Sequence, residues 1–312
     1  MRGSRVRVPP SAPVHLPLRG IEVPIIAAQP PTTIVVPAAG KGTRLHPLTL
    51  AISKEMLPLG RKPVLDHVVA EALAAGIRRT VFIVSPDKHD GTQYYGEAGQ
   101  WAELEFAFAV QQEQLGLGHA VLQAEDAVGG RSFAVALGDS VIYSPEVPPP
   151  FQRLLAAFCA MDAAGVILVQ RHPVEDAGRY GIVKPKSGVA EPFEIADVIE
   201  KPGQEQLRTE LSADGEFAYA IAGRYALRPV VFDYLRNLKP GALGEFQLTD
   251  AIRGMLADGH RVWCVPLRPT EKRRDIGTFR TYFEAFCLAA LEDSDCGDYL
   301  RKVLHVKAED WT

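Results

Sequence analysis

The sequence predicts an α/β fold, and three features of the chain support that prediction. Strand-like apolar runs alternate with runs whose apolar residues recur at helical spacing. The first strand-like run, residues 32–40, is rich in β-branched residues and suits a central strand that is buried on both faces. A glycine-rich loop follows it directly. Together these features indicate a doubly wound, mainly parallel, Rossmann-like sheet with a smaller mixed β region.

The elements of the amino-terminal half follow in a regular order. Residues 1–31 are rich in proline and lack a sustained period, so we expect a disordered tail there. After the first strand, residues 63–75 carry apolar side chains at helical spacing, and Gly76 stands where a helix C-cap would end it. The next predicted elements are a strand over 78–85, a strand over 104–110, a helix over 118–130 and a strand over 131–140.

The second half continues the alternation of strands and helices, but a mixed β region interrupts it. Between Tyr180 and Gly223, glycines, prolines and short β-branched runs indicate a smaller mixed β region, about residues 172–225, that covers the carboxyl edge of the sheet. We therefore expect one domain over 32–290 and a carboxyl-terminal helical extension over 291–312. The other predicted elements are a helix over 151–165, a strand over 166–171, a helix over 246–259, a strand over 260–267 and a helix over 277–292.

Composition limits the class of protein and its setting. The 312 residues are 47% hydrophobic and 23% charged, as in an ordinary globular domain. A net charge of -4 with no long basic run argues against a nucleic-acid partner. No run approaches the roughly 20 apolar residues of a membrane span, and no secretion signal is evident. We expect a cytoplasmic setting with reduced thiols, because the cysteines are scattered and form no C-x-x-C pair: Cys159, Cys264, Cys287 and Cys296.

The glycine-rich loop PAAGKGTRLHP is the first candidate site. Ligands of open α/β sheets settle outside the carboxyl ends of the strands, where this loop begins. Gly40 and Gly42 let backbone N–H groups approach phosphate oxygens, and Lys41 and Arg44 add positive charge. The loop is neither G-x-G-x-x-G nor a P-loop, which disfavours a dehydrogenase and a P-loop ATPase. A surface turn with incidental charges remains the alternative.

A second cation follows the loop at a short distance along the chain. Lys54 stands ten residues after Arg44 and opens the sequence KEMLPLGRKP. Two such cations can converge on one triphosphate. In-line displacement at phosphorus requires this arrangement, because negative charge accumulates on the phosphoryl oxygens and on the leaving pyrophosphate.

These motifs carry a resemblance to a known family. GKGTRLHPLT and SKEMLPLGRKP resemble the signature of the sugar-phosphate nucleotidyltransferases, and KEMLP is most like the version in the bacterial UTP–glucose-1-phosphate uridylyltransferases. The resemblance runs from about Thr33 to about Phe286. It implies transfer from UTP to glucose 1-phosphate, which yields UDP-glucose and pyrophosphate. It assigns catalysis to Arg44 and Lys54, and nucleotide binding to Ala38, Ala39, Gly40, Gly42 and Glu55.

The resemblance also places the base, the metal and the sugar. Gln111 and Gly116 match the family's base-binding residues, Asp139 and Asp275 its Mg²⁺ ligands, and Gly181, Glu200 and Lys201 its sugar and sugar-phosphate contacts. Asp139 and Lys201 are thereby expected to be catalytic as well. Each motif also has a purely structural explanation, which stays open. Residues 114–124 could simply start a helix, the two aspartates could cap turns, and the E-K-P sequence could be only a strand-to-turn junction. Glu245 is either a sugar contact or a cap, and His119 is left unassigned.

Two departures from the family pattern and three competing functions remain. Arg61 stands where the family usually has an acid, and the segment before Gln111 is short. Both departures leave the reaction class intact and bear on oligomeric contacts and on the choice of base and sugar. We expect a homo-oligomer that acts on small-molecule substrates. The competing functions are a dTTP- or other NTP-dependent transferase, a catalytically silent sugar-nucleotide-binding subunit and, more weakly, a dehydrogenase.

Overall fold

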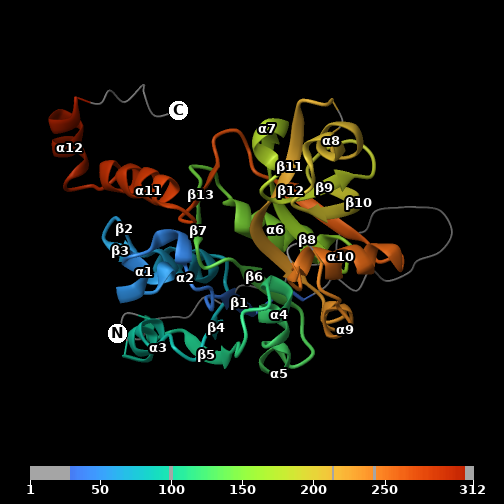
Figure 1. The fold of residues 1–312 in the computed structure, drawn as a ribbon, viewed down its shortest axis with the longest axis horizontal. Coiled ribbons are helices and arrows are strands. Elements are labelled where there is room, and N and C mark those ends of the chain that lie inside the picture. The colour runs from blue at the N-terminus through green and yellow to red at the C-terminus, as the bar shows by residue number, and fades with distance from the viewer. Residues whose placement is uncertain (1–28, 98–100, 213, 242–243, 306–312) are drawn as a thin grey trace, which may run out of the picture.

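The computed structural model describes residues 29–97, 101–212, 214–241 and 244–305 (Figure 1). A sheet of nine strands in the order β5-β4-β1-β6-β11-β8-β12-β10-β9 forms the centre of the fold. Apolar helical faces pack against both sides of it, in two separate core clusters. The tail expected over 1–31 falls almost entirely outside the described residues. No helix within the described ranges combines the length and apolar composition needed to cross a bilayer.

The amino-terminal half of the sheet is parallel, as the sequence predicts. β1 pairs in parallel with β4 on one side and with β6 on the other, and β4 pairs in parallel with β5. The β-branched side chains of β1 are buried on both faces. These strands span Thr33–Pro37 (β1), Arg79–Val84 (β4), Glu105–Val110 (β5) and Phe133–Ala136 (β6).

The second half corrects the expectation of a mainly parallel sheet with a separate β region. β11 lies in the middle of the sheet, antiparallel to both β6 and β8, while β10 and β9 extend its far end. The sheet is therefore mixed, since only β8 and β12 pair in parallel here. The bounds are Gly165–Pro173 (β8), Gly181–Pro185 (β9), Phe193–Glu200 (β10), Phe217–Leu227 (β11) and Val262–Pro266 (β12).

Helices cover the two faces of the sheet in two groups. One face carries α4, α5, α9 and α10, and the other carries α2, α3 and α6. The helix expected over 118–130 is two short helices, the second of which ends at Gly129 in the left-handed conformation. The bounds are Val64–Ala74 (α2), Asp90–Glu97 (α3), Leu117–Leu122 (α4), Glu125–Val128 (α5), Pro150–Ala160 (α6), Val231–Arg236 (α9) and Leu248–Ala257 (α10).

Two short ladders that the sequence did not reveal lie beside the sheet. β7 (Ser140–Tyr143) continues from the loop after β6 and pairs antiparallel with β13 (Lys272–Asp275). β2 (Pro58–Leu59) pairs with β3 (Lys62–Pro63) and packs under α11 (Phe279–Leu291). In Figure 1, α11 and α12 (Gly297–Leu304) reach away from the sheet. The remaining helical turns are Thr43–Leu45 (η1), Leu48–Ala51 (α1), Lys54–Met56 (η2), Val174–Ala177 (α7), Gln204–Gln206 (α8) and Leu207–Leu211 (η4).

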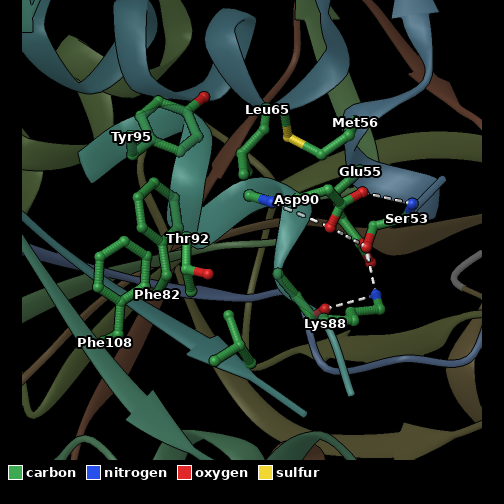
Figure 2. A pocket seen from close by; sticks show the side chains of 13 residues that line it. Ser53, Glu55, Met56, Leu65, Phe82, Lys88, Asp90, Thr92, Tyr95 and Phe108 are labelled. Carbon is green, nitrogen blue, oxygen red and sulfur yellow. Dashed lines mark hydrogen bonds and ion pairs between the residues drawn. The ribbon is translucent and has the colours of Figure 1, made fainter. Parts of the chain in front are cut away.

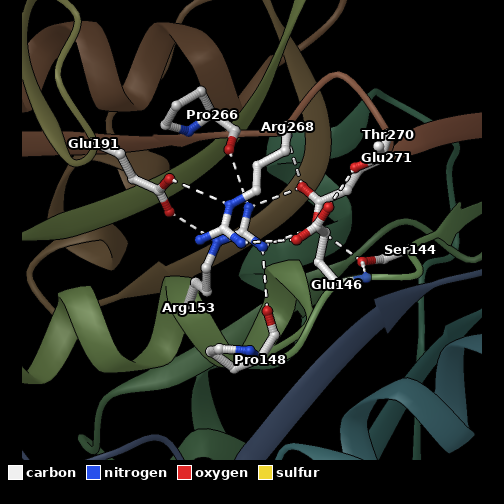
Figure 3. A network of polar contacts seen from close by, with 9 residues as sticks. All are labelled: Ser144, Glu146, Pro148, Arg153, Glu191, Pro266, Arg268, Thr270 and Glu271. Carbon is white, nitrogen blue, oxygen red and sulfur yellow. Dashed lines mark hydrogen bonds and ion pairs between the residues drawn. The ribbon is translucent and has the colours of Figure 1, made fainter.

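A buried ion-pair network fixes the loop that leads into β13. Figure 3 shows Arg153 of α6 between Glu271 and Glu191. Its guanidinium donates to both carboxylate oxygens of Glu271 at 2.8 Å and to Glu191 at 2.8 Å. Glu271 also accepts the backbone N–H of Arg268 at 2.7 Å. The network therefore anchors the start of β13, whose last residue is Asp275.

Candidate active site

A cleft of about 570 Å³ opens where β1 and β6 end, between the glycine-rich loop and the loops that follow β10. Its walls come from segments that are far apart in sequence, because parallel strands bring their following loops to one edge of the sheet. Among the residues proposed from the sequence, those that line the cleft are Ala39, Gly40, Lys41, Gly42, Arg44, Lys54, Glu55, Gln111, Gly116, Asp139, Glu200, Lys201 and Glu245.

Three proposed residues lie next to the cleft without lining it. Ala38 lies behind the glycine-rich loop, where its carbonyl accepts a hydrogen bond from Lys88 at 2.6 Å. Gly181 lies beneath Glu200, and a Cβ there would come within 2.9 Å of the Glu200 carboxylate. Asp275 accepts the backbone N–H of Gly277, a residue of the cleft wall, at 3.1 Å. The structure thus gathers the predicted residues at one site or directly against it.

The glycine-rich loop turns sharply at Gly42. Its φ of 65° lies in the left-handed region, and its carbonyl accepts the Thr49 hydroxyl at 2.8 Å. A Cβ at Gly42 would stand 3.0 Å from the Thr49 methyl group, while one at Gly40 would point toward the Lys54 ammonium at 3.9 Å. Glycine is therefore required at Gly42 by both conformation and space, and the loop lies directly beside Lys54.

Lys54 and Asp139 form an ion pair at the floor of the cleft. The Lys54 ammonium donates to Asp139 Oδ2 at 2.7 Å, although the two residues lie 85 positions apart. Burial alone would raise the pKa of the Asp139 carboxyl, but the charge and hydrogen bond of Lys54, with help from Arg273, lower that pKa to about 2. Burial alone would likewise lower the pKa of Lys54, yet Asp139 and Glu55 raise it. Both groups are therefore ionised at neutral pH.

Two charged residues that could not be found from the sequence, Lys88 and Asp90, hold the chain neighbours of Lys54 in place. Figure 2 shows Lys88 beside Glu55, and Asp90 beside Ser53. Lys88 donates to Glu55 Oε2 at 2.7 Å, and Asp90 accepts both the backbone N–H and the hydroxyl of Ser53, at 2.7 and 2.6 Å. The residues on either side of Lys54 are thus held by one short segment. The carboxylate of Glu55, only 4% exposed, is occupied by this bond.

The base-binding residues proposed from the sequence meet at the start of α4. The buried amide of Gln111 donates to the Gly116 carbonyl at 3.2 Å and lies 3.0 Å from His119 Nδ1. His119 therefore orients Gln111. Gly116 has a φ of 114°, and a Cβ there would approach the Phe246 carbonyl to 2.7 Å. This close approach gives a physical reason for glycine at this position.

The part of the cleft that was predicted to bind the sugar is formed by the end of β10. Lys201 has a φ of 45°, a strained conformation for a lysine, and its backbone N–H donates to the Tyr180 carbonyl at 3.0 Å. Its ammonium lies 3.7 Å from Glu200 Oε1, and Glu200 Oε2 accepts the Thr249 hydroxyl at 3.1 Å. Burial raises the pKa of Glu200 despite the neighbouring Lys201. The strained backbone aims both side chains at the cleft.

The two proposed metal ligands lie on adjacent segments. The Ile276 N–H donates to the Asp139 carbonyl at 3.0 Å, and Asp275 pairs with Ser140 in the β7–β13 ladder. Carboxylate oxygens are donors that Mg²⁺ prefers, so Asp139, in the loop before β7, and Asp275, at the end of β13, fit this ion. In the part of the chain that the structure describes, no group of three or more His, Cys, Asp or Glu side chains could hold a metal by itself. A divalent ion at Asp139 and Asp275 would accordingly need further oxygen ligands from phosphate or water.

Proteins of similar sequence include enzymes that act on nucleotides, in agreement with the residues gathered at this cleft. The sequence model of a family described as "Nucleotidyl transferase" matches residues 33–291. The chain belongs to the nucleotidyl transferase family. Relatives include the UTP–glucose-1-phosphate uridylyltransferase of Mycoplasma pneumoniae, 34% identical over 83% of this chain and 92% of its own length. That of Staphylococcus haemolyticus is 33% identical over 86% of this chain and 96% of its own.

Solved structures of similar sequence also share the fold. A UTP-bound UGPase from Acinetobacter baumannii superposes with a TM-score of 0.74 at 26% identity, over 89% of this chain and 100% of that one. A UDP-glucose pyrophosphorylase complexed with UDP-glucose gives 0.70 at 28% identity, over 87% and 99%. Nucleotidyltransferases of this family generally use a divalent metal.

Arg61, where this nucleotidyl transferase departs from the expected pattern, lies away from the cleft. Its guanidinium donates to both carboxylate oxygens of Asp293, at 2.6 and 3.0 Å, and pairs with Asp295 at 2.8 Å. The arginine thus ties the β2–β3 turn to the segment after α11. Arg61 joins two parts of the same chain and is not among the residues that line the cleft.

Proposed function

We propose that this nucleotidyl transferase converts UTP and glucose 1-phosphate to UDP-glucose and pyrophosphate. The observation that carries the proposal is the convergence of Arg44, Lys54 and Lys201 with the ionised Asp139 on one cleft. Two phosphorylated substrates need cations from both sides if they are to meet end to end. The relatives named for this reaction support the choice of substrates.

The reaction needs no nucleophilic side chain. An oxygen of the sugar phosphate, already ionised at neutral pH, attacks the α-phosphorus of UTP as the bond to the β-phosphate oxygen breaks, and pyrophosphate departs with that electron pair. Arg44 and Lys54 stabilise the charge that builds on the β- and γ-phosphates. Lys201 orients the attacking phosphate. Asp139 keeps Lys54 in place, since the two form a hydrogen-bonded ion pair.

Magnesium is the divalent ion that we propose for the site, held by Asp139 and Asp275 together with substrate oxygens. When bound, it would neutralise charge on the α-phosphate. The fit rests on the two carboxylates of adjoining segments and on the low pKa of Asp139, which leaves its oxygens free of a proton. Hard oxygen donors in this number suit Mg²⁺, which tends to keep several water or phosphate ligands.

We assign the contacts with uridine and with glucose to different residues at the cleft. Gln111, oriented by His119, would read the base edge, and Gly116 would let the base approach the backbone. Ala39, Gly40 and Gly42 would contact the triphosphate. Glu200 would hold sugar hydroxyls, with Gly181 leaving room beneath its carboxylate. A homo-oligomeric state and a cytoplasmic setting stay predictions.

Turnover with a substrate panel tests the proposal. The enzyme is assayed with UTP, dTTP, ATP and GTP, each paired with glucose 1-phosphate and other hexose 1-phosphates in the presence of Mg²⁺. We expect the highest kcat/KM for UTP with glucose 1-phosphate. A preference for dTTP would replace the uridylyl claim with the alternative nucleotide. Absence of labelled pyrophosphate exchange into UTP at high enzyme concentration would instead indicate a sugar-nucleotide-binding subunit.

A further inference from the structure

The β13 strand presents two arginines to opposite sides. Side chains alternate along a strand, so Arg273 shares one face with Asp275, and Arg274 faces the other way. Arg274 is fully engaged: its guanidinium lies 3.1 Å from Glu292 and 5.0 Å from the centre of the Tyr143 ring. The face that Arg273 shares with Asp275 is the face toward the proposed active site.

Arg273 makes no direct ion pair with a carboxylate among the residues that the structure describes, although its charge acts on Asp139. Its Nε is buried and makes no hydrogen bond there. Its guanidinium lies 5.1 Å from the centre of the Tyr180 ring, a contact with a π face rather than with a carboxylate. A buried arginine donor without an acceptor destabilises the fold, because it has lost its hydrogen bond to water and has formed none with the protein. An anion that enters the cleft would supply the acceptor.

The position of Arg273 indicates which anion. The Arg273 guanidinium lies on the ring of Tyr180, which directly precedes Gly181 and whose backbone carbonyl accepts the Lys201 N–H. Burial, followed by the charges of Arg273 and Arg179, lowers the pKa of nearby His172, and both arginines lie on the Tyr180 ring, so the surroundings of Tyr180 are cationic. Arg273 is also within electrostatic range of Asp139. It therefore lies near Asp139 and against Tyr180, the residue whose carbonyl accepts the Lys201 N–H.

We propose that Arg273 binds the phosphate of the hexose 1-phosphate together with Lys201, and that it does so through the planar fork of its guanidinium. The inference rests on the proposed function and adds a second cation for the attacking phosphate. Lys201 supplies a point charge, whereas an arginine can donate two parallel hydrogen bonds to one phosphate and so fix its orientation. Arg44 and Lys54, which line the cleft together with the glycine-rich loop, are the cations proposed for the nucleotide.

Steady-state kinetics of Arg273→Gln test the proposal, with Arg274→Gln as the matched control on the same strand. We expect Arg273→Gln to raise the KM for glucose 1-phosphate at least about tenfold while the KM for UTP changes less than about twofold. In the reverse direction the KM for UDP-glucose should rise and that for pyrophosphate should not. Arg273→Lys, which keeps the charge but loses the fork, should fall between the two. Arg274→Gln should leave all four values unchanged.

Two results would overturn the proposal: an unchanged KM for glucose 1-phosphate, or an equal rise in the values for UTP and pyrophosphate. If Arg273→Gln does not fold, as judged by circular dichroism and urea unfolding, Arg273→Lys and Arg273→Met carry the same comparison. If the wild-type enzyme prefers another pair of substrates, the proposed function fails, and the KM split is measured on that pair. If it turns over none, calorimetric titration of glucose 1-phosphate into wild type and Arg273→Gln decides, with equal affinities counting against Arg273.

Discussion

The ammonium of Lys54 donates a hydrogen bond to Asp139 Oδ2 over 2.7 Å, and so joins the segment after the glycine-rich loop to the end of β6. Each group keeps the other charged: the pKa of Lys54 is raised and that of Asp139 lies at about 2. The cation proposed for the triphosphate and the carboxylate proposed for the metal are thus held in one geometry. Loss of either partner should affect both functions.

Asp139→Asn should lower kcat by well over tenfold, which corresponds to at least about 1.4 kcal/mol in the activation barrier. The amide removes the negative charge that positions Lys54 and that faces the proposed metal. Asp162→Asn, at an exposed aspartate paired only with Arg228, serves as the control. Retention of more than about a tenth of the wild-type kcat would contradict the assignment of Asp139.

Lys88→Met and Asp90→Asn should each lower kcat with smaller effects on KM. Lys88 and Asp90 hold Glu55 and Ser53, the two neighbours of Lys54, so either change loosens the backbone that aims this lysine. A shift of about 1 Å in a catalytic group can cost as much as a hundredfold in rate.

Lys186→Met is the control for Lys88, because Lys186 is an exposed lysine that pairs with Glu194 on the surface. Lys88→Arg, which can still donate to Glu55, should recover part of kcat. A positioning role for Lys88 is excluded if Lys88→Met changes urea stability but leaves kcat as in the wild-type enzyme.

Gly116→Ala should raise the KM for UTP more than about tenfold. A Cβ at Gly116 would stand 2.7 Å from the Phe246 carbonyl, and the φ of 114° is one that alanine rarely adopts. Gly130→Ala separates the two causes, because Gly130 also has a positive φ of 70° but no atom within 4 Å of its would-be Cβ. Equal KM values for UTP in the two variants would argue against close packing at Gly116 as the determinant of binding.

Local motifs could be interpreted from the sequence, whereas long-range pairings could not. The glycine-rich loop and Lys54 are close in sequence, and their chemistry follows from residue types and from a strand that ends just before them. β11 was assigned to a separate region because it lies near β9 and β10 in sequence, yet its register places it between β6 and β8. Nothing local in the chain specifies a partner strand that far away.

The same limit applies to the side chains that support the site. Lys88 reaches Glu55 across 33 positions, and a single lysine in a polar segment resembles an ordinary surface residue. Arg273 stands between two other cations, in a run that suggests a solvated face. Only the pairing of β13 with β7 shows that alternate residues of that run face different surroundings. Sequence reasoning could propose the groups that contact phosphate, but not the packing that holds them.

Glu271→Gln should destabilise the fold by about 3 to 5 kcal/mol at neutral pH, because it leaves the Arg153 guanidinium buried with one charge partner fewer. Burial opposes ionisation of Glu271, but the hydrogen bonds from Arg153 and from the Arg268 backbone lower its pKa below the ordinary 4.5. A carboxyl whose pKa is lower in the folded state contributes stability above its unfolded pKa, and that contribution is lost as pH falls through the folded value.

The stability difference between wild type and Glu271→Gln should therefore be largest near neutral pH and shrink as the pH is lowered below the ordinary pKa of 4.5 and through the lower folded-state pKa. Urea unfolding across this range measures it. The double variant Arg153→Met with Glu271→Leu should recover part of the loss, since replacing both ions by apolar side chains removes the unpaired charge. A difference that stays constant with pH would show that shape, and not the charge of Glu271, stabilises the approach to β13.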